Sequence, residues 1–239
     1  MHTDNFVRAF WYMSNNFGDN LNYDVIKYIS GREPVCTFNR QEEHYIVCGS
    51  ILTEAKDNTT VWGAGFGNSY DSIKSDAKVI TVRGHLSEML IDSAIEYVGD
   101  PALIMPMIYN PTIKKKYNIG IIPHWSQIEL ISEKFMYSDE LLFINPLQPV
   151  KEVIDKINSC ENIASSSLHG LILADAYNVP NQWIDFGTEI GGDGFKFKDY
   201  YSTTDLEKQP SKVIIPDLFV VSNYAYDLNE LINTCPFKK

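Results

Sequence analysis

One segment of the chain combines three hydroxyls and an imidazole at the start of a predicted helix. In it, Ser165, Ser166, Ser167 and His169 stand where a buried strand passes into that helix. The first turn of a helix has N–H groups without helical partners and the positive end of the dipole, so it attracts anions. The pKa of His169 is therefore predicted to be low in the empty protein and to rise when a phosphate binds. The pattern favours an anion site with a proton donor, and a structural histidine is the alternative.

Two further strand ends carry side chains suited to anions or to proton transfer. Arg83 follows an apolar run and precedes a glycine, and its planar guanidinium can bind a carboxylate or phosphate through two hydrogen bonds. An ion pair with one of the 31 acidic residues is an equally good reading of Arg83. His124 ends another strand. Because the carboxyl ends of parallel strands share one edge of a sheet, His124 is predicted to face the same cleft as His169.

Two loops near the N-terminus are rich in glycine and small polar residues. Asn16, Gly18 and Asp19 lie between the first predicted strand and helix, where simple N-capping is the alternative to binding. Gly63 and Gly65 suggest a dinucleotide loop, but the third glycine of that pattern and the helix after it are missing. These two glycines instead predict a close backbone approach to a ligand or to a second lobe, or a tight structural turn.

The elements that must position these residues alternate between strands and helices, which is typical of an α/β fold with parallel sheets. The predicted strands are 6–13, 45–48, 60–62, 78–82, 117–122, 141–144, 162–165 and 182–186. The predicted helices are 20–29, 85–95, 126–135, 150–158, 168–177 and 226–233. A stretch rich in Pro, Asn and Lys at 106–116 predicts a linker. We therefore expect two Rossmann-like lobes facing a cleft, residues 1–110 and 111–239, with a closing helix near 226–233.

Composition excludes several classes of protein. With 44% hydrophobic and 21% charged residues, the 239-residue chain is expected to be a globular protein without a transmembrane segment. Its net charge of -11 argues against a nucleic-acid partner. The four cysteines form no CxxC pair, so we expect reduced thiols and no metal site. No signal peptide is visible, which favours a cytoplasmic location.

Taken together, short motifs in a fixed order resemble the polysaccharide pyruvyltransferase family. The matching pieces are 16–19 (Asn-Phe-Gly-Asp), 62–65 (Trp-Gly-Ala-Gly), 82–84 (Val-Arg-Gly), 99–102 (Gly-Asp-Pro-Ala), 119–124 (Ile-Gly-Ile-Ile-Pro-His) and 166–170 (Ser-Ser-Leu-His-Gly), followed by 174–177 (Ala-Asp-Ala-Tyr). The resemblance implies a GT-B-like fold and transfer of a pyruvyl group from phosphoenolpyruvate to a sugar or lipid-linked oligosaccharide, giving a pyruvate ketal. It implies no cofactor, metal or nucleotide sugar, and a cytoplasmic or peripheral inner-membrane location.

The family reaction assigns expected roles to these residues. His169 is the predicted acid and phosphate contact, Arg83 grips an anionic group, Asp19 orients or deprotonates the acceptor, and His124 supports the donor. The other predicted substrate-binding residues are Asn16, Gly18, Gly63, Gly65, Ser165, Ser166 and Ser167. Many family members have arginine where this chain has Ser167, so one expected anion contact is missing.

Two alternatives share the predicted architecture. A catalytically silent relative would bind a glycan without turnover, and the serine that replaces the usual arginine is consistent with it. A GT-B glycosyltransferase would bind a nucleotide sugar, which titration with a nucleoside diphosphate would reveal.

Overall fold

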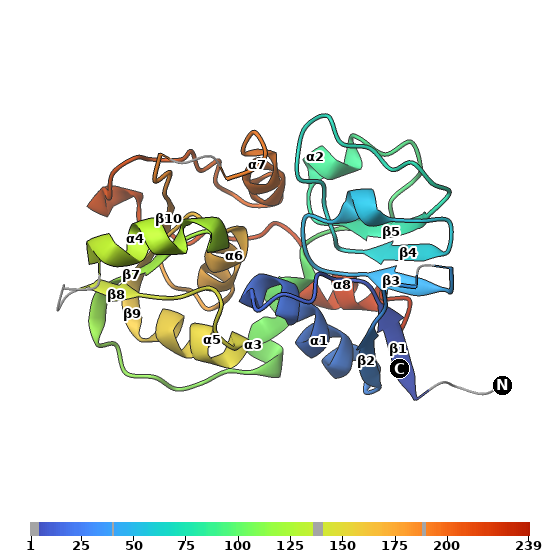
Figure 1. Cartoon of the computed structure of the whole chain (residues 1–239), viewed down its shortest axis with the longest axis horizontal. Helices are drawn as coiled ribbons and strands as arrows, with labels where there is room; N and C mark the ends of the chain where they lie inside the picture. Colours follow the sequence, from blue (N-terminus) through green and yellow to red (C-terminus); the bar gives the residue numbers. More distant parts are fainter. Residues whose placement is uncertain (1–4, 40, 136–140, 188–189) are drawn as a thin grey trace.

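The computed structural model describes residues 5–39, 41–135, 141–187 and 190–239, and within them two parallel sheets lie side by side (Figure 1). The first sheet contains β1 (Phe6–Ala9), β2 (Glu33–Cys36), β3 (His44–Ile46), β4 (Thr59–Trp62), β5 (Lys78–Val82) and β6 (Tyr97–Val98). The second contains β7 (Tyr117–Ile122), β8 (Leu141–Phe143), β9 (Cys160–Ser165) and β10 (Asn181–Trp183). The strand orders are β2-β1-β3-β4-β5-β6 and β10-β9-β7-β8. The predicted α/β class with parallel sheets is confirmed.

Helices and short 3-10 turns connect these strands, as parallel pairing requires. The helices are α1 (Phe17–Ser30), α2 (His85–Glu88), α3 (Met105–Ile108), α4 (Ile128–Phe135), α5 (Val150–Asn158), α6 (Leu168–Ala176), α7 (Phe195–Tyr201) and α8 (Leu228–Asn233). The 3-10 turns are η1 (Leu52–Glu54), η2 (Pro101–Ile104), η3 (Trp125–Gln127) and η4 (Pro216–Leu218).

Local sequence explains both ends of α1. The side chain of Asn16 accepts a hydrogen bond from the Gly18 N–H at 3.3 Å, which satisfies one of the free donors of the first turn. Gly31 ends the helix in the left-handed conformation, with φ of 63°, where a glycine is favoured. The predicted end is therefore confirmed, whereas the helix starts at Phe17, earlier than the predicted residue 20.

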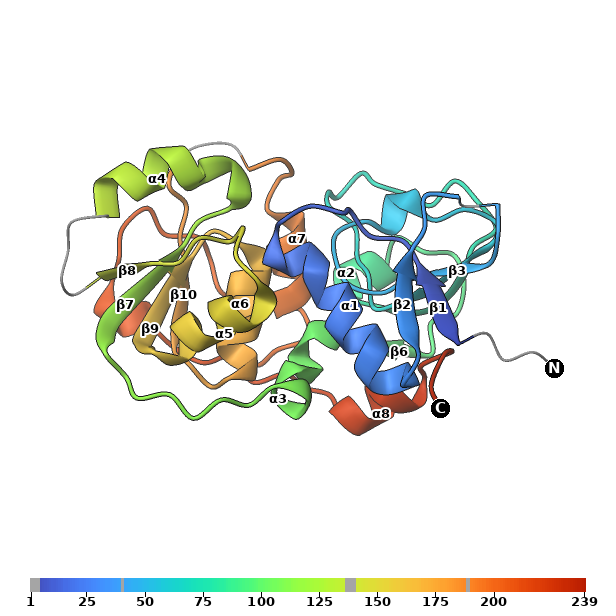
Figure 2. The same ribbon diagram turned by 60° about the horizontal axis from the view of Figure 1, so that its bottom comes forward.

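The hydrophobic core runs through both halves of the molecule. Its largest cluster includes Leu21 of α1, Val153 of α5 and Leu171 of α6, each fully buried. Figure 2 shows α1, α3, α5 and α6 between the two sheets, and α6 packs against η2 as well as against β9. For this reason α6 is buried on every side and has no polar face. The two halves thus share a core.

The C-terminal segment differs from its predicted place. The closing helix exists as α8, but it packs on the first half, against β6 and η2. Just beyond it, Thr234 Oγ1 accepts a hydrogen bond from Trp62 Nε1 at 3.0 Å, and the Phe237 ring lies 5.7 Å from that of Trp62. The last residues of the predicted 111–239 lobe therefore belong with the first sheet. The division near residue 110 and the GT-B-like arrangement stay predictions.

Two strands and two helices were not expected from the sequence, namely β2, β6, α3 and α7. Strand β2 contains Pro34, which lacks a backbone donor and is tolerated because this strand lies at the edge of its sheet. Of the predicted helix 85–95, only α2 is helical, and it is one helical turn long. The residues that follow it leave the helix in a tight turn. Leu90 and Ile91 reach the second hydrophobic cluster from that turn, so the apolar spacing resembled a longer helix.

Candidate active site

A cavity of about 680 Å³ opens at the carboxyl ends of strands from both sheets, where α/β proteins usually bind ligands. Its walls are the loop from β1 into α1, the loop after β3, the segment after β7 and the start of α6, together with one lysine from α7. The lining residues are Tyr12, Met13, Ser14, Asn16, Asp19, Phe38, Gly49, Ser50, Ile51, His124, Trp125, Leu147, Ser167, Leu168, His169 and Lys196. Five predicted site residues, namely Asn16, Asp19, His124, Ser167 and His169, therefore meet in one cavity.

His169 lies in the first turn of α6 and presses against the start of α1. A Cβ atom added to Gly18 would come within 2.5 Å of His169 Nδ1, so only glycine leaves room for this ring. The buried Nε2 atom has no hydrogen-bond partner among the described residues. Burial, followed by the nearby charges of Arg83 and Lys196, lowers the pKa of His169 to about 3. The predicted direction of the shift is confirmed, with burial as its leading cause, and the imidazole is neutral at pH 7.

Lys196 brings a cation into the cavity from α7, a helix that the sequence reading missed. Burial and the charge of Arg83 lower its pKa to about 8, while Asp19 opposes that change. Within the described part of the chain, its ammonium group forms no ion pair with a carboxylate. Lys196 therefore brings a positive charge to the cavity. Ser167, which stands where the resemblance leads one to expect an arginine, cannot provide that charge. The only hint in the sequence is a glycine-rich stretch, 191–194, before a run of alternating aromatic and lysine residues.

Asp19 is held by two neighbours from its own loop. Its Oδ2 atom accepts hydrogen bonds from Ser14 Oγ at 2.6 Å and from Asn16 Nδ2 at 3.3 Å. Burial nevertheless raises the pKa of Asp19, and the two hydrogen bonds and the charge of Lys196 only partly offset that rise. A carboxylate with a raised pKa, held in one orientation, is suited to accept a proton.

His124 lies across the cavity in the segment after β7. Its backbone N–H donates to Ser166 Oγ at 2.8 Å, and its Nδ1 atom lies 2.8 Å from Ser126 Oγ. Burial and the charge of Lys196 lower the pKa of His124 to about 4. Ser166 in turn donates to Gln127 Oε1 at 2.6 Å, so this serine positions the histidine loop and does not line the cavity.

Ser165 also lies behind the cavity wall. Its hydroxyl is fully buried, lies 3.0 Å from the Ile122 carbonyl oxygen and accepts the Ser167 N–H at 3.0 Å. It therefore ties the end of β9 to the end of β7. Of the three predicted serines, Ser167 is the one that reaches the cavity.

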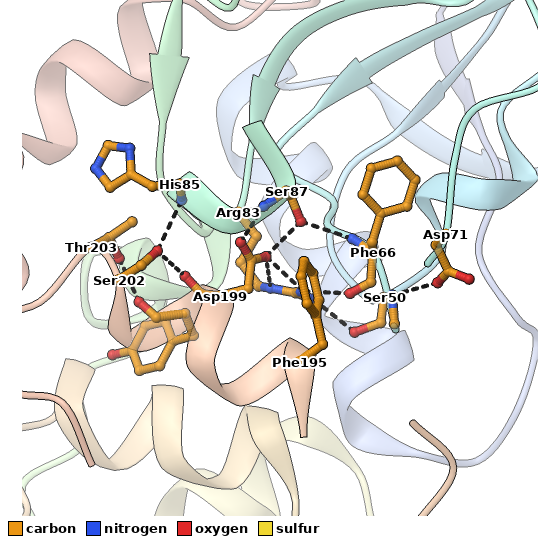
Figure 3. A network of polar contacts seen from close by, with 12 residues as sticks. Ser50, Phe66, Asp71, Arg83, His85, Ser87, Phe195, Asp199, Ser202 and Thr203 are labelled. Carbon is orange, nitrogen blue, oxygen red and sulfur yellow. Dashed lines mark hydrogen bonds and ion pairs between the residues drawn. The ribbon is translucent and has the colours of Figure 1, made fainter. Parts of the chain in front are cut away.

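Arg83 is fully buried in a polar network and does not line the cavity, although its partner Ser50 does (Figure 3). Its Nη2 atom lies 2.7 Å from Asp199 Oδ2, and its Nε donates to the same oxygen at 2.9 Å. Ser50 Oγ and the Phe66 carbonyl accept the other guanidinium hydrogen bonds, at 2.7 and 2.6 Å. Ser87 donates to Asp199 through both its backbone N–H and its hydroxyl, at 2.7 Å each. This geometry favours the structural ion pair that the sequence left as the alternative.

The glycine loop packs around the same network. A Cβ atom at Gly65 would lie 2.5 Å from Arg83 Cζ and 2.8 Å from Asp199 Oδ2. Gly63, with φ of 105°, would collide with the ring of Pro101 if it carried a side chain. Neither glycine lines the cavity. Gly65 approaches Asp199 of the second predicted lobe, as one sequence interpretation expected, whereas Gly63 approaches Pro101 of its own lobe. The predicted substrate contact of these two glycines is not borne out by the lining of this cavity.

The buried network reaches the cavity through α7. Asp199 and Lys196 are three residues apart on this helix, which places them on neighbouring turns of one face. The ion pair with Arg83 therefore holds the helix that carries Lys196. Arg83 itself does not line the cavity.

Comparisons with known proteins decide the family. Residues 15–186 match the family model described as polysaccharide pyruvyl transferase. The chain belongs to this family. The resemblance read from its motifs is thereby confirmed, and membership of the family makes the chain a polysaccharide pyruvyltransferase.

Two relatives are similar to this chain over most of its length. An uncharacterized protein of Acanthamoeba polyphaga mimivirus is 28% identical over 212 residues, which cover 82% of this chain and 74% of the relative. The succinoglycan biosynthesis protein ExoV of Rhizobium meliloti is 30% identical over 208 residues, 83% of this chain and 64% of the relative. The match thus spans somewhat less than two thirds of the ExoV protein.

Membrane spans and metal-ion clusters are two further features to consider in residues 5–39, 41–135, 141–187 and 190–239. No helix in these ranges combines the length and apolarity needed to cross a lipid bilayer. In the same ranges, no group of three or more His, Cys, Asp and Glu side chains is arranged to hold a metal ion.

Proposed function

We propose that the chain transfers the pyruvyl group of phosphoenolpyruvate to a sugar of a polysaccharide or of a lipid-linked precursor, where it forms a ketal. One observation carries the proposal: His169, Lys196, His124 and Asp19 line a single cavity at the start of α6. Family membership supports the transferase class. The relative named for succinoglycan biosynthesis supports a polysaccharide acceptor.

The cavity suits a small anionic donor although the protein carries a net charge of -11. Phosphoenolpyruvate has a carboxylate and a phosphate, and the cationic side chain of Lys196 lines the cavity. The start of α6 adds free N–H groups and the positive end of its dipole. A bound anion beside His169 raises the pKa of the imidazole, since it stabilises the protonated form. Donor binding thereby converts a neutral histidine into an acid.

The proposed reaction uses three proton transfers. His169 gives its proton to the methylene carbon of phosphoenolpyruvate, which leaves an oxocarbenium-like centre at the neighbouring carbon. Asp19 takes the proton of an acceptor hydroxyl as its oxygen bonds to that carbon. Phosphate then leaves with the electrons of its C–O bond, a second hydroxyl of the same sugar closes the ketal, and the proton of that hydroxyl passes to the now neutral His169. Lys196, with His124 beside it, offsets the donor charge throughout.

This scheme uses no metal or cofactor, and we propose that none is needed. The carboxylate comes from the half formed by the first sheet, and both histidines come from the other half. We therefore assign the acceptor to the first half and the donor to the second, in a GT-B-like arrangement. We place the reaction on the cytoplasmic side, in solution or at the inner membrane surface, where phosphoenolpyruvate is available.

Donor binding is tested by thermal unfolding in the presence of phosphoenolpyruvate, with pyruvate, phosphate and UDP as controls. At 100 times its dissociation constant, a ligand stabilises the folded state by about 2.7 kcal/mol, which gives a clear shift in Tm. We expect that shift with phosphoenolpyruvate and its loss in His169→Ala. A shift with UDP and none with phosphoenolpyruvate would support a nucleotide-sugar glycosyltransferase instead.

Donor affinity is expected to depend on pH through Lys196. With a pKa of about 8, this lysine is charged at pH 7 and loses its proton as the pH rises. Binding of phosphoenolpyruvate should therefore weaken by about tenfold between pH 7 and pH 9. In Lys196→Arg the guanidinium stays charged, so the loss due to position 196 should disappear and only the pH dependence from proton uptake by His169 should remain. Calorimetric titration measures both, and an equal loss in wild type and Lys196→Arg would contradict this role.

The contact between α1 and the histidine ring gives a separate prediction. Gly18→Ala forces the His169 ring away from its place, and a displacement of about 1 Å can lower the rate by about 10²-fold. We expect that loss in transfer rate with a small change in Tm, because the ring can turn into the open cavity. Gly191→Ala is the matched control, since an added Cβ meets nothing within 4 Å there. Equal rates for the two variants would show that the position of His169 does not matter.

A further inference from the structure

Three exposed aromatic side chains surround the mouth of the cavity. Tyr12, Phe38 and Trp125 line it and are 47%, 61% and 55% exposed. They come from three loops, which follow β1, β2 and β7. We refer to these three side chains as the aromatic rim. Large aromatic surfaces gathered beside a pocket usually mark a binding site.

Two rings of the aromatic rim, those of Tyr12 and Phe38, pack against a buried ring that is not part of the rim. Phe10, which is 1% exposed, makes edge-to-face contacts with Tyr12 and Phe38, at centroid distances of 5.6 and 5.9 Å. The Tyr12 hydroxyl also donates to Glu54 Oε1 at 3.1 Å. The two rings are therefore positioned before any ligand arrives, so little conformational entropy is lost on binding.

Trp125 completes the rim from the side of the second sheet. It begins η3, directly after His124, and the two rings are 5.5 Å apart. Trp11, Trp62 and Trp183, the other tryptophans of the chain, are at most 6% exposed. Trp125 is thus the tryptophan that a ligand in the cavity mouth would cover.

We infer that the aromatic rim holds the acceptor sugar by stacking against its ring, an inference that rests on the proposed function. A pyranose has a C–H face that packs on an aromatic ring, and hydroxyls at its edge that need hydrogen-bond partners. The same cavity offers such partners in Ser14, Asn16 and Asp19, which are hydrogen-bonded to one another. An anionic membrane surface fits less well, because a net charge of -11 would be repelled.

The test uses the fluorescence of Trp125. Methyl β-glucopyranoside and methyl β-galactopyranoside are titrated into the full chain, and acrylamide quenching of tryptophan is measured. Stacking should shield Trp125, so quenching should fall with a saturable dependence on at least one glycoside, and Trp125→Phe should abolish the effect. Sorbitol has hydroxyls but no ring face and should give no shielding. Phe38→Ala should weaken the glycoside dissociation constant by about tenfold, and Phe38→Tyr should restore it.

Controls separate this inference from the proposed function. Tyr70→Ala removes a still more exposed aromatic ring outside the cavity and should leave glycoside binding unchanged. Phe38→Ala should keep the thermal shift with phosphoenolpyruvate, because the donor contacts lie elsewhere. Shielding by neither glycoside, equal shielding by sorbitol, or an unchanged constant in Phe38→Ala would overturn the inference. Shielding by neutral phosphatidylcholine vesicles alone would overturn it in favour of a lipid. Glycoside binding through the rim, without phosphate release from phosphoenolpyruvate, would instead refute the proposed function.

Discussion

Replacing His169 by alanine is expected to lower the rate of pyruvyl transfer by about 10²–10⁴-fold, the usual contribution of a positioned general acid. The imidazole is buried, its Nε2 atom has no partner among the described residues, and it borders the cavity. Its removal enlarges a cavity that already reaches solvent, so water can fill the space and folding should survive. Phosphate release from phosphoenolpyruvate, followed in the presence of acceptor, measures the rate.

A second variant separates proton transfer from binding. Glutamine in place of His169 keeps a polar group near the position of Nε2 but has no proton to give at neutral pH. We expect His169→Gln to retain part of the donor affinity and to be as slow as His169→Ala. Turnover within a few-fold of wild type in either variant would exclude His169 as the acid.

The second large effect concerns the buried ion pair between Arg83 and Asp199. Both side chains are fully buried, so Asp199→Ala leaves a guanidinium without its carboxylate and should destabilise the fold by about 3–5 kcal/mol. Arg83→Met should destabilise the fold by a similar amount, because it leaves the Asp199 carboxylate buried without its positive partner. The double variant Arg83→Met/Asp199→Leu replaces the pair by apolar groups and should be more stable than either single variant. Urea unfolding of the four proteins measures the coupling.

Function distinguishes the positioning role of this pair from stability alone. In the double variant α7 loses the contact that places Lys196, so donor affinity should fall even where the fold is recovered. A folded double variant with wild-type affinity for phosphoenolpyruvate would show that the pair does not position Lys196. The exposed pair Lys27–Glu33, 2.6 Å apart, is the control, and its loss should have a much smaller effect on stability and none on binding.

The parts of the fold predicted most accurately are those with local signals. Runs of β-branched and apolar residues gave β5 and β7 with the bounds that the structure shows, and the proline before Val150 marked the start of α5. His169 and Asp19 were located because each follows a strand at the edge where ligands bind. That rule needs only the order of strands and helices along the chain and the direction of the strands, and both can be inferred from the sequence pattern.

The parts that were missed depend on contacts between distant segments. Lys196 lies on a helix of seven residues, too short to form by itself and stabilised by packing against α2. Asp199 meets Arg83 across 116 positions of sequence, and no local pattern announces such a pair. From the sequence, Arg83 was suited to bind an anionic ligand. In the structure, the anion that it binds is Asp199 of the same chain. Lys196, which lines the cavity, could not be identified from a local sequence pattern.

The core shared by the two halves has a consequence for how substrates come and go. Leu21, Val153 and Leu171 belong to one buried cluster that both halves share, so a wide hinge swing between the halves would expose buried apolar surface. The entrance must then keep a nearly constant width through the catalytic cycle. A donor seated beside His169 lies behind whatever occupies the mouth. In the proposed reaction, phosphoenolpyruvate would therefore enter first and the sugar second, and the modified sugar would leave before phosphate.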